Sequence, residues 1–123
     1  MSKIFILLFM IFLHIVDDYY LQGILASMKQ KSWWKENVPE RFYKYDYIIA
    51  LIMHSFSWTF MIMLPVAMSI WFNIDGIFLT FFICNVIAHA VTDNAKANDK
   101  IINLVIDQIV HILLIIWTWF CLV

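Results

Sequence analysis

Charged residues are scarce in this chain: they make up 14% of its 123 residues, whereas 64% are hydrophobic. No run of lysine or arginine is dense enough to hold nucleic acid, so a nucleic-acid partner is not expected. A soluble domain of this length could not bury so much apolar side chain. The composition therefore predicts a single-domain integral membrane protein whose solvent is the lipid bilayer.

Cysteine is also scarce, and a leader cleavage site is missing. Cys84 and Cys121 lie within apolar runs and no CxxC motif occurs, which argues against a disulfide framework. The apolar run at the N-terminus is followed not by small residues but by His14 and the pair Asp17 and Asp18. We therefore expect a retained first helix rather than a cleaved signal peptide.

Long apolar runs are abundant. They predict transmembrane helices over about residues 2–28, 45–72, 77–95 and 101–123, with an amphipathic, interfacial connection over residues 29–44. Transmembrane strands would be shorter and would alternate polar and apolar residues, and these runs do neither. The expected fold is an all-α, four-helix, up-down transmembrane bundle.

The basic residues suggest an orientation. They concentrate in residues 29–44 and 96–100, whereas the remaining connection, residues 73–76, carries only Asp75. Lysine and arginine favour cytoplasmic connections. We expect a multi-pass protein of a bacterial inner (cytoplasmic) membrane with both termini outside and both basic connections in the cytoplasm; Lys3 weakly opposes this.

Histidines and aspartates interrupt the apolar runs. Groups of this kind are costly inside a bilayer and usually mark function. The chain places these in the predicted spans: His14, Asp17, Asp18, His54, His89, Asp93, Asp107 and His111. Three pairs have a spacing of four residues: His14–Asp18, His89–Asp93 and Asp107–His111. Residues at i and i+4 share one helix face, so each pair can point at one place.

The predicted topology brings these pairs to one depth. With 1.5 Å of rise per residue, they lie roughly 10–15 Å in from the cytoplasmic ends of their helices, with Asp93 nearer the rim. Helical bundles build metal sites in this way, from carboxylates and imidazoles on facing helices.

Electrostatics favours a bound cation. Asp18, Asp93 and Asp107 would repel one another, and no lysine or arginine is expected at their depth. The donor set suits a divalent metal, with zinc expected and manganese or iron as alternatives, as one ion or two. The predicted ligands are His14, Asp18, His54, His89, Asp93, Asp107 and His111. His54 is the least secure of them, because no aspartate lies four residues away.

Other polar residues could support this site. Asp18, Asp93 and Asp107 are also the candidate catalytic residues, since an uncoordinated carboxylate can act as a general base. Asp17, which faces about 100° away from Asp18, is expected outside the ligand set as a residue that supports the ligands. Side chains that could orient ligands or bind substrate are Gln22, Asn85, Asn103 and Gln108. Lys96 could attract a phosphate, or it could simply reach toward the membrane interface.

The combined pattern resembles a known family. Its parts are His14-x3-Asp18-Tyr19-x-Leu21-Gln22, His54, His89-x3-Asp93-x2-Lys96 and Asp107-Gln108-x2-His111. It resembles the small bacterial and phage membrane proteins catalogued as domain of unknown function 3307, over nearly the whole chain. The chain departs from them in its short length and its doubled aspartate. The resemblance implies a likeness to membrane-bound metal-dependent hydrolases, as an analogy between families.

Three hypotheses stay open. The first is a metal-dependent hydrolase near the cytoplasmic leaflet, acting on a lipid or isoprenoid phosphate. The second is a transporter or channel for a metal ion or proton, which the apolar outer halves of the spans disfavour. The third is a non-catalytic envelope interaction protein, encoded by a phage, in which the polar cluster is structural. A homodimer is compatible with each of them.

Overall fold

A computed structural model describes all residues 1–123 of the protein, which forms helices and no strands. In chain order these are α1 (Lys3–Val16), the π-helical segment η1 (Asp17–Leu21), α2 (Leu25–Met28), α3 (Lys31–Asn37), the 3₁₀ turn η2 (Arg41–Tyr43), α4 (Asp46–Ser69), α5 (Gly76–Ala97) and α6 (Leu104–Leu122). Four helical segments are long and apolar enough to cross a membrane: Lys3–Leu21, Arg41–Ser69, Gly76–Ala97 and Leu104–Leu122. The predicted all-helical fold with four long apolar helices is confirmed.

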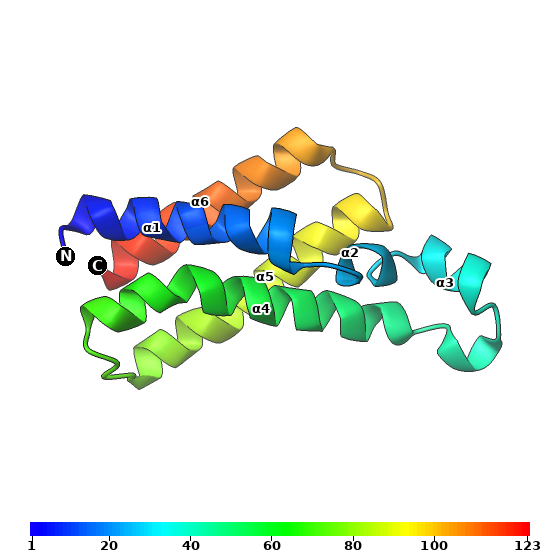
Figure 1. Ribbon diagram of the computed structural model, residues 1–123, viewed down its shortest axis with the longest axis horizontal. Coiled ribbons are helices and arrows are strands. Elements are labelled where there is room, and N and C mark those ends of the chain that lie inside the picture. The colour runs from blue at the N-terminus through cyan, green and yellow to red at the C-terminus, as the bar shows by residue number, and fades with distance from the viewer.

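The helix α4 lies at the centre of the bundle, where it packs against α1, α5 and α6. Figure 1 shows the two chain termini at the same end of the bundle and the short helices α2 and α3 at the other end. An even number of long helices in up-down order produces this arrangement. The connection between α1 and α4 is therefore gathered at one end, far from both termini.

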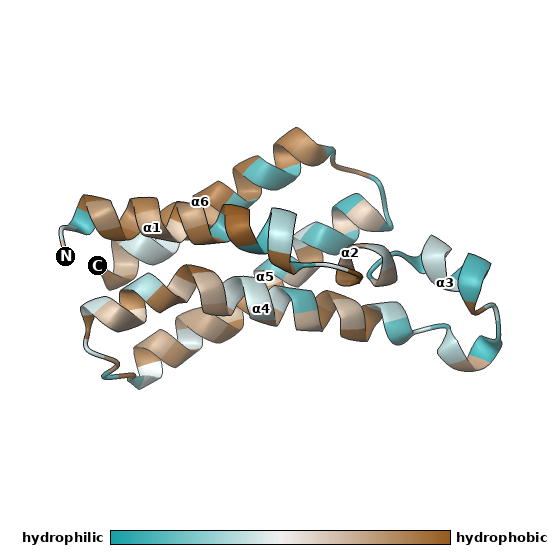
Figure 2. Ribbon diagram, viewed as in Figure 1, coloured by the Kyte–Doolittle hydropathy of each residue, from teal (hydrophilic) through white to brown (hydrophobic).

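A compact apolar core fills the half of the bundle nearest the termini. Its members are Ile6, Met10, Trp58, Ile62, Met63, Val66, Ala67, Phe78 and Ile115. The outer surface of the long helices is also apolar, with side chains such as Phe5, Ile83 and Trp117 exposed. Figure 2 shows this coating along the helices and the hydrophilic residues toward the α2–α3 end. Apolar surface on this scale fits a lipid environment.

The first helix is shorter than expected. The predicted span over residues 2–28 stops at Leu21, and the chain turns before α2 begins at Leu25. The turn uses Gly23 at a φ of 55°, a left-handed conformation that glycine adopts at little cost. In consequence the chain folds back along the bundle and brings Lys29, expected in an interfacial connection, to a buried position.

The other helix ends lie within a few residues of their expected places. The α6 helix begins at Leu104 rather than at residue 101, because the side chain of Asn103 accepts a hydrogen bond from the Ile106 amide and caps the helix. The residues expected to form the interfacial connection contain α3 and η2. They are thus helical over part of their length.

Candidate metal centre

Four long segments contribute ionisable side chains to one buried cluster. Its members are His14 of α1, Asp17 and Asp18 of η1, His54 of α4, His89 and Asp93 of α5, and Asp107 and His111 of α6. None is more than 2% exposed except Asp18, whose side chain is 9% exposed. The structure thus brings together all seven residues predicted as ligands, at the end of the apolar core that faces away from the termini.

The separations within the cluster fit atoms arranged around an ion. Oδ1 of Asp18 lies 3.3 Å from Nε2 of His54 and 3.9 Å from Nε2 of His89. Oδ1 of Asp93 lies 3.9 Å from Nε2 of His89 and 3.6 Å from Nε2 of His111. Most of these separations are long for hydrogen bonds. They are close to the roughly 3.3 Å that separates ligand atoms around a tetrahedral zinc with bonds of about 2.0 Å.

Three imidazoles present ring nitrogens that no protein group satisfies. Both nitrogens of His54 and both nitrogens of His111 are buried without a hydrogen-bond partner. His89 bonds to Ser55 Oγ through Nδ1 at 3.1 Å, which leaves its Nε2 unpaired. Buried polar atoms are normally hydrogen-bonded, so a set of unpaired nitrogens in one place requires an explanation. A metal ion would supply a partner for one nitrogen of each ring, since a neutral imidazole has one free lone pair and carries a proton on its other nitrogen.

His14 differs from the other three histidines, because both of its ring nitrogens are already engaged. Trp58 Nε1 donates to its Nδ1 at 2.7 Å, and Gln108 Oε1 lies 3.0 Å from its Nε2. An indole N–H can only donate, so Nδ1 is the acceptor and Nε2 carries the proton that Gln108 receives. His14 therefore has no free lone pair in this arrangement, whereas His54, the ligand expected to be least secure, has its nitrogens free.

The π-helical segment η1 places two adjacent aspartates around His54. Asp17 accepts a hydrogen bond from Ser57 Oγ at 2.6 Å, and its other oxygen lies 3.6 Å from His54 Nδ1. Asp18 faces the opposite nitrogen, Nε2, of the same ring. Asp17 thus lies beside a predicted ligand and outside the ligand groups, in the supporting position expected for it, and it belongs to the wider turn of η1. A carboxylate behind the imidazole is the arrangement that orients metal-binding histidines.

Lys29 is a member of the site that the sequence did not reveal. Its Nζ donates to Asp93 Oδ2 at 2.8 Å and to Gln22 Oε1 at 2.7 Å, and the residue is 6% exposed. The expectation that no basic residue reaches the depth of the aspartates is therefore wrong. It failed because the turn at Gly23 ends the first helix early and returns the chain toward the cluster.

An open cavity of about 180 Å³ leads to the cluster. It is lined by Asp18, Tyr19, Gln22, Lys29, Asp93, Lys96, Leu104, Asp107 and Gln108. Lys96 Nζ lies 3.4 Å from Asp107 Oδ2, and Gln108 Nε2 donates to the same oxygen at 3.1 Å. The predicted polar partners Gln22, Lys96 and Gln108 are thus all at the mouth of the cluster, and two lysine ammonium groups face the cavity.

Two of the predicted polar partners lie elsewhere. Asn85 donates to Thr118 Oγ1 at 2.9 Å and to the Phe81 carbonyl, and so links α5 to α6 on the side of the apolar core. Asn103 caps α6 and makes no contact with the cluster through its side chain oxygen, which accepts from the Ile106 amide. The side chain of Asn85 therefore serves helix packing, and the side chain of Asn103 serves helix capping.

The charges of the cluster leave a deficit of positive charge. Its carboxylates are Asp17, Asp18, Asp93 and Asp107, and its ammonium groups are Lys29 and Lys96. With neutral imidazoles the sum is −2, which one divalent cation would cancel. Unbalanced charge is costly in a buried site, so the cluster as built favours a dication.

Three overlapping groups of ligand atoms could hold a metal ion. They are His14, Asp18 and His111; Asp18, His54 and His89; and His89, Asp93 and His111. Within each group the donor atoms lie within 4.8 Å of one another. Because Asp18, His89 and His111 each belong to two groups, the cluster offers neighbouring positions that share ligands. The mixture of imidazole nitrogen and carboxylate oxygen fits zinc, manganese or iron.

Sequence reasoning missed the residues that hold the histidines in place. Ser55, Ser57 and Trp58 all follow His54 on α4, and each contacts the cluster through a hydrogen bond. Ser57 and Trp58 lie three and four residues after His54, so they share its helix face. In the sequence, these two serines and the tryptophan follow the one histidine that has no aspartate four residues away, and this pattern could have indicated that they support it.

Comparisons with protein-family models, with curated proteins and with solved structures found no match to this chain. The functional argument therefore depends on the geometry of the cluster and on the chemistry of its residues.

Proposed function

We propose that this protein is a multi-pass membrane protein that binds a divalent metal and acts as a metal-dependent hydrolase near the cytoplasmic leaflet. The observation that carries the proposal is the convergence of unpaired nitrogens from His54, His89 and His111 on the carboxylates of Asp18 and Asp93. Hydrogen bonds between the helices leave these nitrogens unpaired, whereas a cluster built only to join helices is expected to satisfy them, and this difference favours a metal site.

Zinc is the metal we propose. The first position uses His54, His89 and Asp18, whose ligand atoms form one compact group, and Asp17 orients His54 from behind. A second position beside it would use His111 and Asp93. Zinc prefers three protein ligands and an open fourth position when it is catalytic. A bound zinc ion lowers the pKa of its water into the neutral range, which is the chemistry that hydrolysis requires.

The proposed substrate is a lipid or isoprenoid phosphate ester. The open cavity beside the cluster is lined by Lys29 and Lys96, whose ammonium groups would bind phosphate oxygens. Asp107 also lines the cavity, and its Oδ1 is buried without a hydrogen-bond partner. It is placed to accept a proton from an attacking water, and we assign it the role of general base. The apolar surface of the helices would keep a lipid substrate within reach.

A transporter is less well supported by the same structure. Ions crossing the bundle would need polar groups beyond the cluster, but Met10, Trp58, Ile62 and Ile115 fill that half and are fully buried. The cavity reaches the cluster from one side. The motifs that resemble domain of unknown function 3307 supply most of the cluster, and we retain that family, with its likeness to membrane hydrolases, as part of the proposal.

Metal analysis of the purified protein tests the first part of the proposal. Full-length protein extracted in a neutral detergent is expected to carry one or two equivalents of zinc. The double variant His54→Gln/His89→Gln should lose it, while Asn85→Ser, one turn before His89 on α5 and bonded to Thr118 outside the cluster, should keep it. A stably folded wild-type protein that carries no metal and takes up none on zinc addition would overturn the metal site.

Activity measurements test the second part separately. Phosphate release from a polyprenyl phosphate in mixed micelles should require zinc, stop with a chelator, and fall sharply in Asp107→Asn. If the protein binds zinc but releases no phosphate from any lipid phosphate, the hydrolase assignment fails while the metal site stands. Zinc flux into proteoliposomes without phosphate release would favour transport.

A further inference from the structure

A second, larger pocket lies at the α3 end of the molecule, away from the cluster. It has a volume of about 580 Å³ and is formed by α3, η2 and the start of α4. Four basic side chains line it: Lys31, Lys35, Arg41 and Lys44. We call it the basic pocket. Trp34, Tyr45 and Tyr47 provide its aromatic walls, and Glu40 is its one acidic residue.

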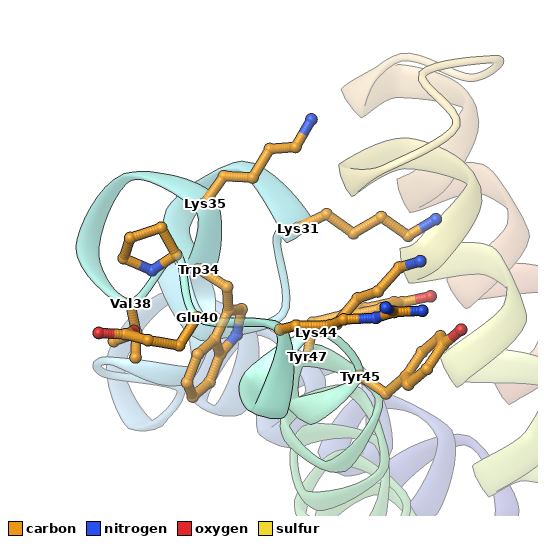
Figure 3. Close-up of a pocket in the computed structure, with 10 residues that line it drawn as sticks. Lys31, Trp34, Lys35, Val38, Glu40, Lys44, Tyr45 and Tyr47 are labelled. Atoms are coloured by element: carbon orange, nitrogen blue, oxygen red, sulfur yellow. The ribbon is translucent and has the colours of Figure 1, made fainter.

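The cations of the basic pocket have no carboxylate partners. The ion pairs of lysine in this protein belong to Lys29 and Lys96, and no carboxylate lies within 4.0 Å of the four basic groups of the pocket. Figure 3 shows Lys31 and Lys44 extending toward the same side as Tyr45, whereas Glu40 extends to the opposite side. The pocket therefore gathers positive charge that its own acidic residue does not neutralise.

Fixed contacts hold the walls of the pocket. Trp34 Nε1 donates to the Met28 carbonyl at 2.6 Å. The backbone amide of Lys31 donates to Asn98 Oδ1 at 2.7 Å, which ties the start of α3 to the end of α5. The ammonium of Lys31 lies 5.1 Å from the centre of the Tyr47 ring. The pocket is thus a formed feature of the fold rather than a set of unrelated surface lysines.

An apolar stripe runs from the pocket along α4. Tyr45, Ile49, Ile52 and Phe56 follow at helical spacing and are all exposed. This stripe belongs to one of the four segments long and apolar enough to cross a membrane, and the basic pocket lies at its beginning. A ligand that joins an anionic group to long hydrocarbon chains would match both features, whereas a free phosphate ion would use only the first.

We propose that the basic pocket binds the phosphate of an anionic phospholipid, with the acyl chains against the stripe on α4. Arginine and lysine bind phosphate oxygens through charge-assisted hydrogen bonds, and basic pockets at the end of membrane helices hold anionic headgroups in this way. Tyrosine and tryptophan favour the same level of a bilayer. The assignment does not depend on the metal centre, since none of the pocket residues belongs to the cluster.

Binding of defined lipids to the full-length protein in neutral detergent tests this site. Native mass spectrometry with dioleoyl phosphatidylglycerol and dioleoyl phosphatidylcholine is expected to show preferential retention of the anionic lipid. The double variant Arg41→Gln/Lys44→Gln should weaken phosphatidylglycerol binding by about thirtyfold and leave phosphatidylcholine binding unchanged. The matched control is Lys3→Gln/Lys100→Gln, which removes two exposed positive charges outside the pocket and should change binding by no more than about twofold.

Three results would overturn the proposal. Equal losses in the two double variants would show diffuse attraction to the whole surface, and unchanged phosphatidylglycerol binding in Arg41→Gln/Lys44→Gln would show that the pocket is not used. Inorganic phosphate that competes as strongly as the lipid would identify a site for a free anion. Zinc content measured on the same samples reports on the metal centre independently, and an unchanged melting temperature shows that the variant is folded.

Discussion

The indole of Trp58 donates its N–H to Nδ1 of His14 across 2.7 Å, in a fully buried contact between α4 and α1. This bond fixes the tautomer of His14, because the ring must then carry its proton on Nε2, next to Gln108. The histidine is held between Trp58 and Gln108 by hydrogen bonds through both of its ring nitrogens. His54, on the other side of Asp18, has no such partner, so the two histidines differ in their freedom to bind a metal.

Zinc affinity should therefore distinguish His14 from His54. We expect His54→Gln to weaken zinc binding by at least about a hundredfold, because it removes a ligand. His14→Gln should weaken it by about tenfold, at the low end of the range for residues around a metal site, because His14 is hydrogen-bonded to no proposed ligand. Competition with a zinc-chelating dye measures both constants on detergent-solubilised protein. Trp58→Phe provides the control, since it frees Nδ1 of His14 without altering His54. Equal losses for the two histidine variants would contradict the distinction.

Asp17 should matter for zinc binding although it is not in a group that could hold the ion. Its carboxylate lies 3.6 Å from Nδ1 of His54 and is fully buried. Asp17→Asn removes the charge that favours the correct tautomer of the ring, and we expect a loss of about 10–100-fold in zinc affinity. Ser57→Ala, which removes only the hydrogen bond to Asp17, should have a smaller effect. Unchanged affinity in Asp17→Asn would show that the carboxylate is merely buried beside the ring.

Removing the metal should lower stability. A ligand that binds the folded state but not the unfolded state stabilises the protein by about 2.7 kcal/mol when its concentration is a hundredfold above its Kd. Addition of a chelator should thus lower the melting temperature of the wild-type protein, and restoring zinc should reverse the shift. The double variant His54→Gln/His89→Gln should melt at one temperature under both conditions. A chelator effect of the same size in that variant would indicate that the metal binds elsewhere.

The fold and the position of the cluster followed from simple periodicities. Apolar runs long enough to cross a membrane gave the four long helices, and the spacing of four residues between His89 and Asp93 or between Asp107 and His111 put each pair on one face. The up-down order then brought the pairs to one level. Each of these steps depends on local spacing, which a single sequence displays directly.

What could not be predicted depends on contacts between distant segments. The left-handed turn at Gly23 is a small departure from regular helix, yet it brings Lys29 into the cluster. The tautomer of His14 is set by Trp58, 44 residues along the chain. No periodicity encodes these pairings. The sequence therefore did not indicate that His54 has unpaired nitrogens whereas His14 does not.

Lys29 gives the sharpest test of the electrostatic balance of the cluster. Its ammonium is buried and lies 2.8 Å from Oδ2 of Asp93, so Lys29→Met leaves that carboxylate buried without its cation. Breaking a buried ion pair from one side costs about 3–5 kcal/mol, and we expect a loss of this size in the free energy of unfolding of the metal-free protein. Unfolding in a denaturing detergent, monitored by tryptophan fluorescence, measures it.

A double variant and the addition of zinc then distinguish the effect of the Lys29 charge from the effect of its packing. Lys29→Met/Asp93→Asn removes both charges and should recover much of the loss in metal-free protein, because no buried carboxylate is left unpaired. Zinc should also reduce the loss in Lys29→Met alone, since a cation held by His89 and His111 lies within reach of Asp93 Oδ1. If neither change restores stability, Lys29 acts through the packing of its hydrocarbon chain, and its charge is not what the cluster requires.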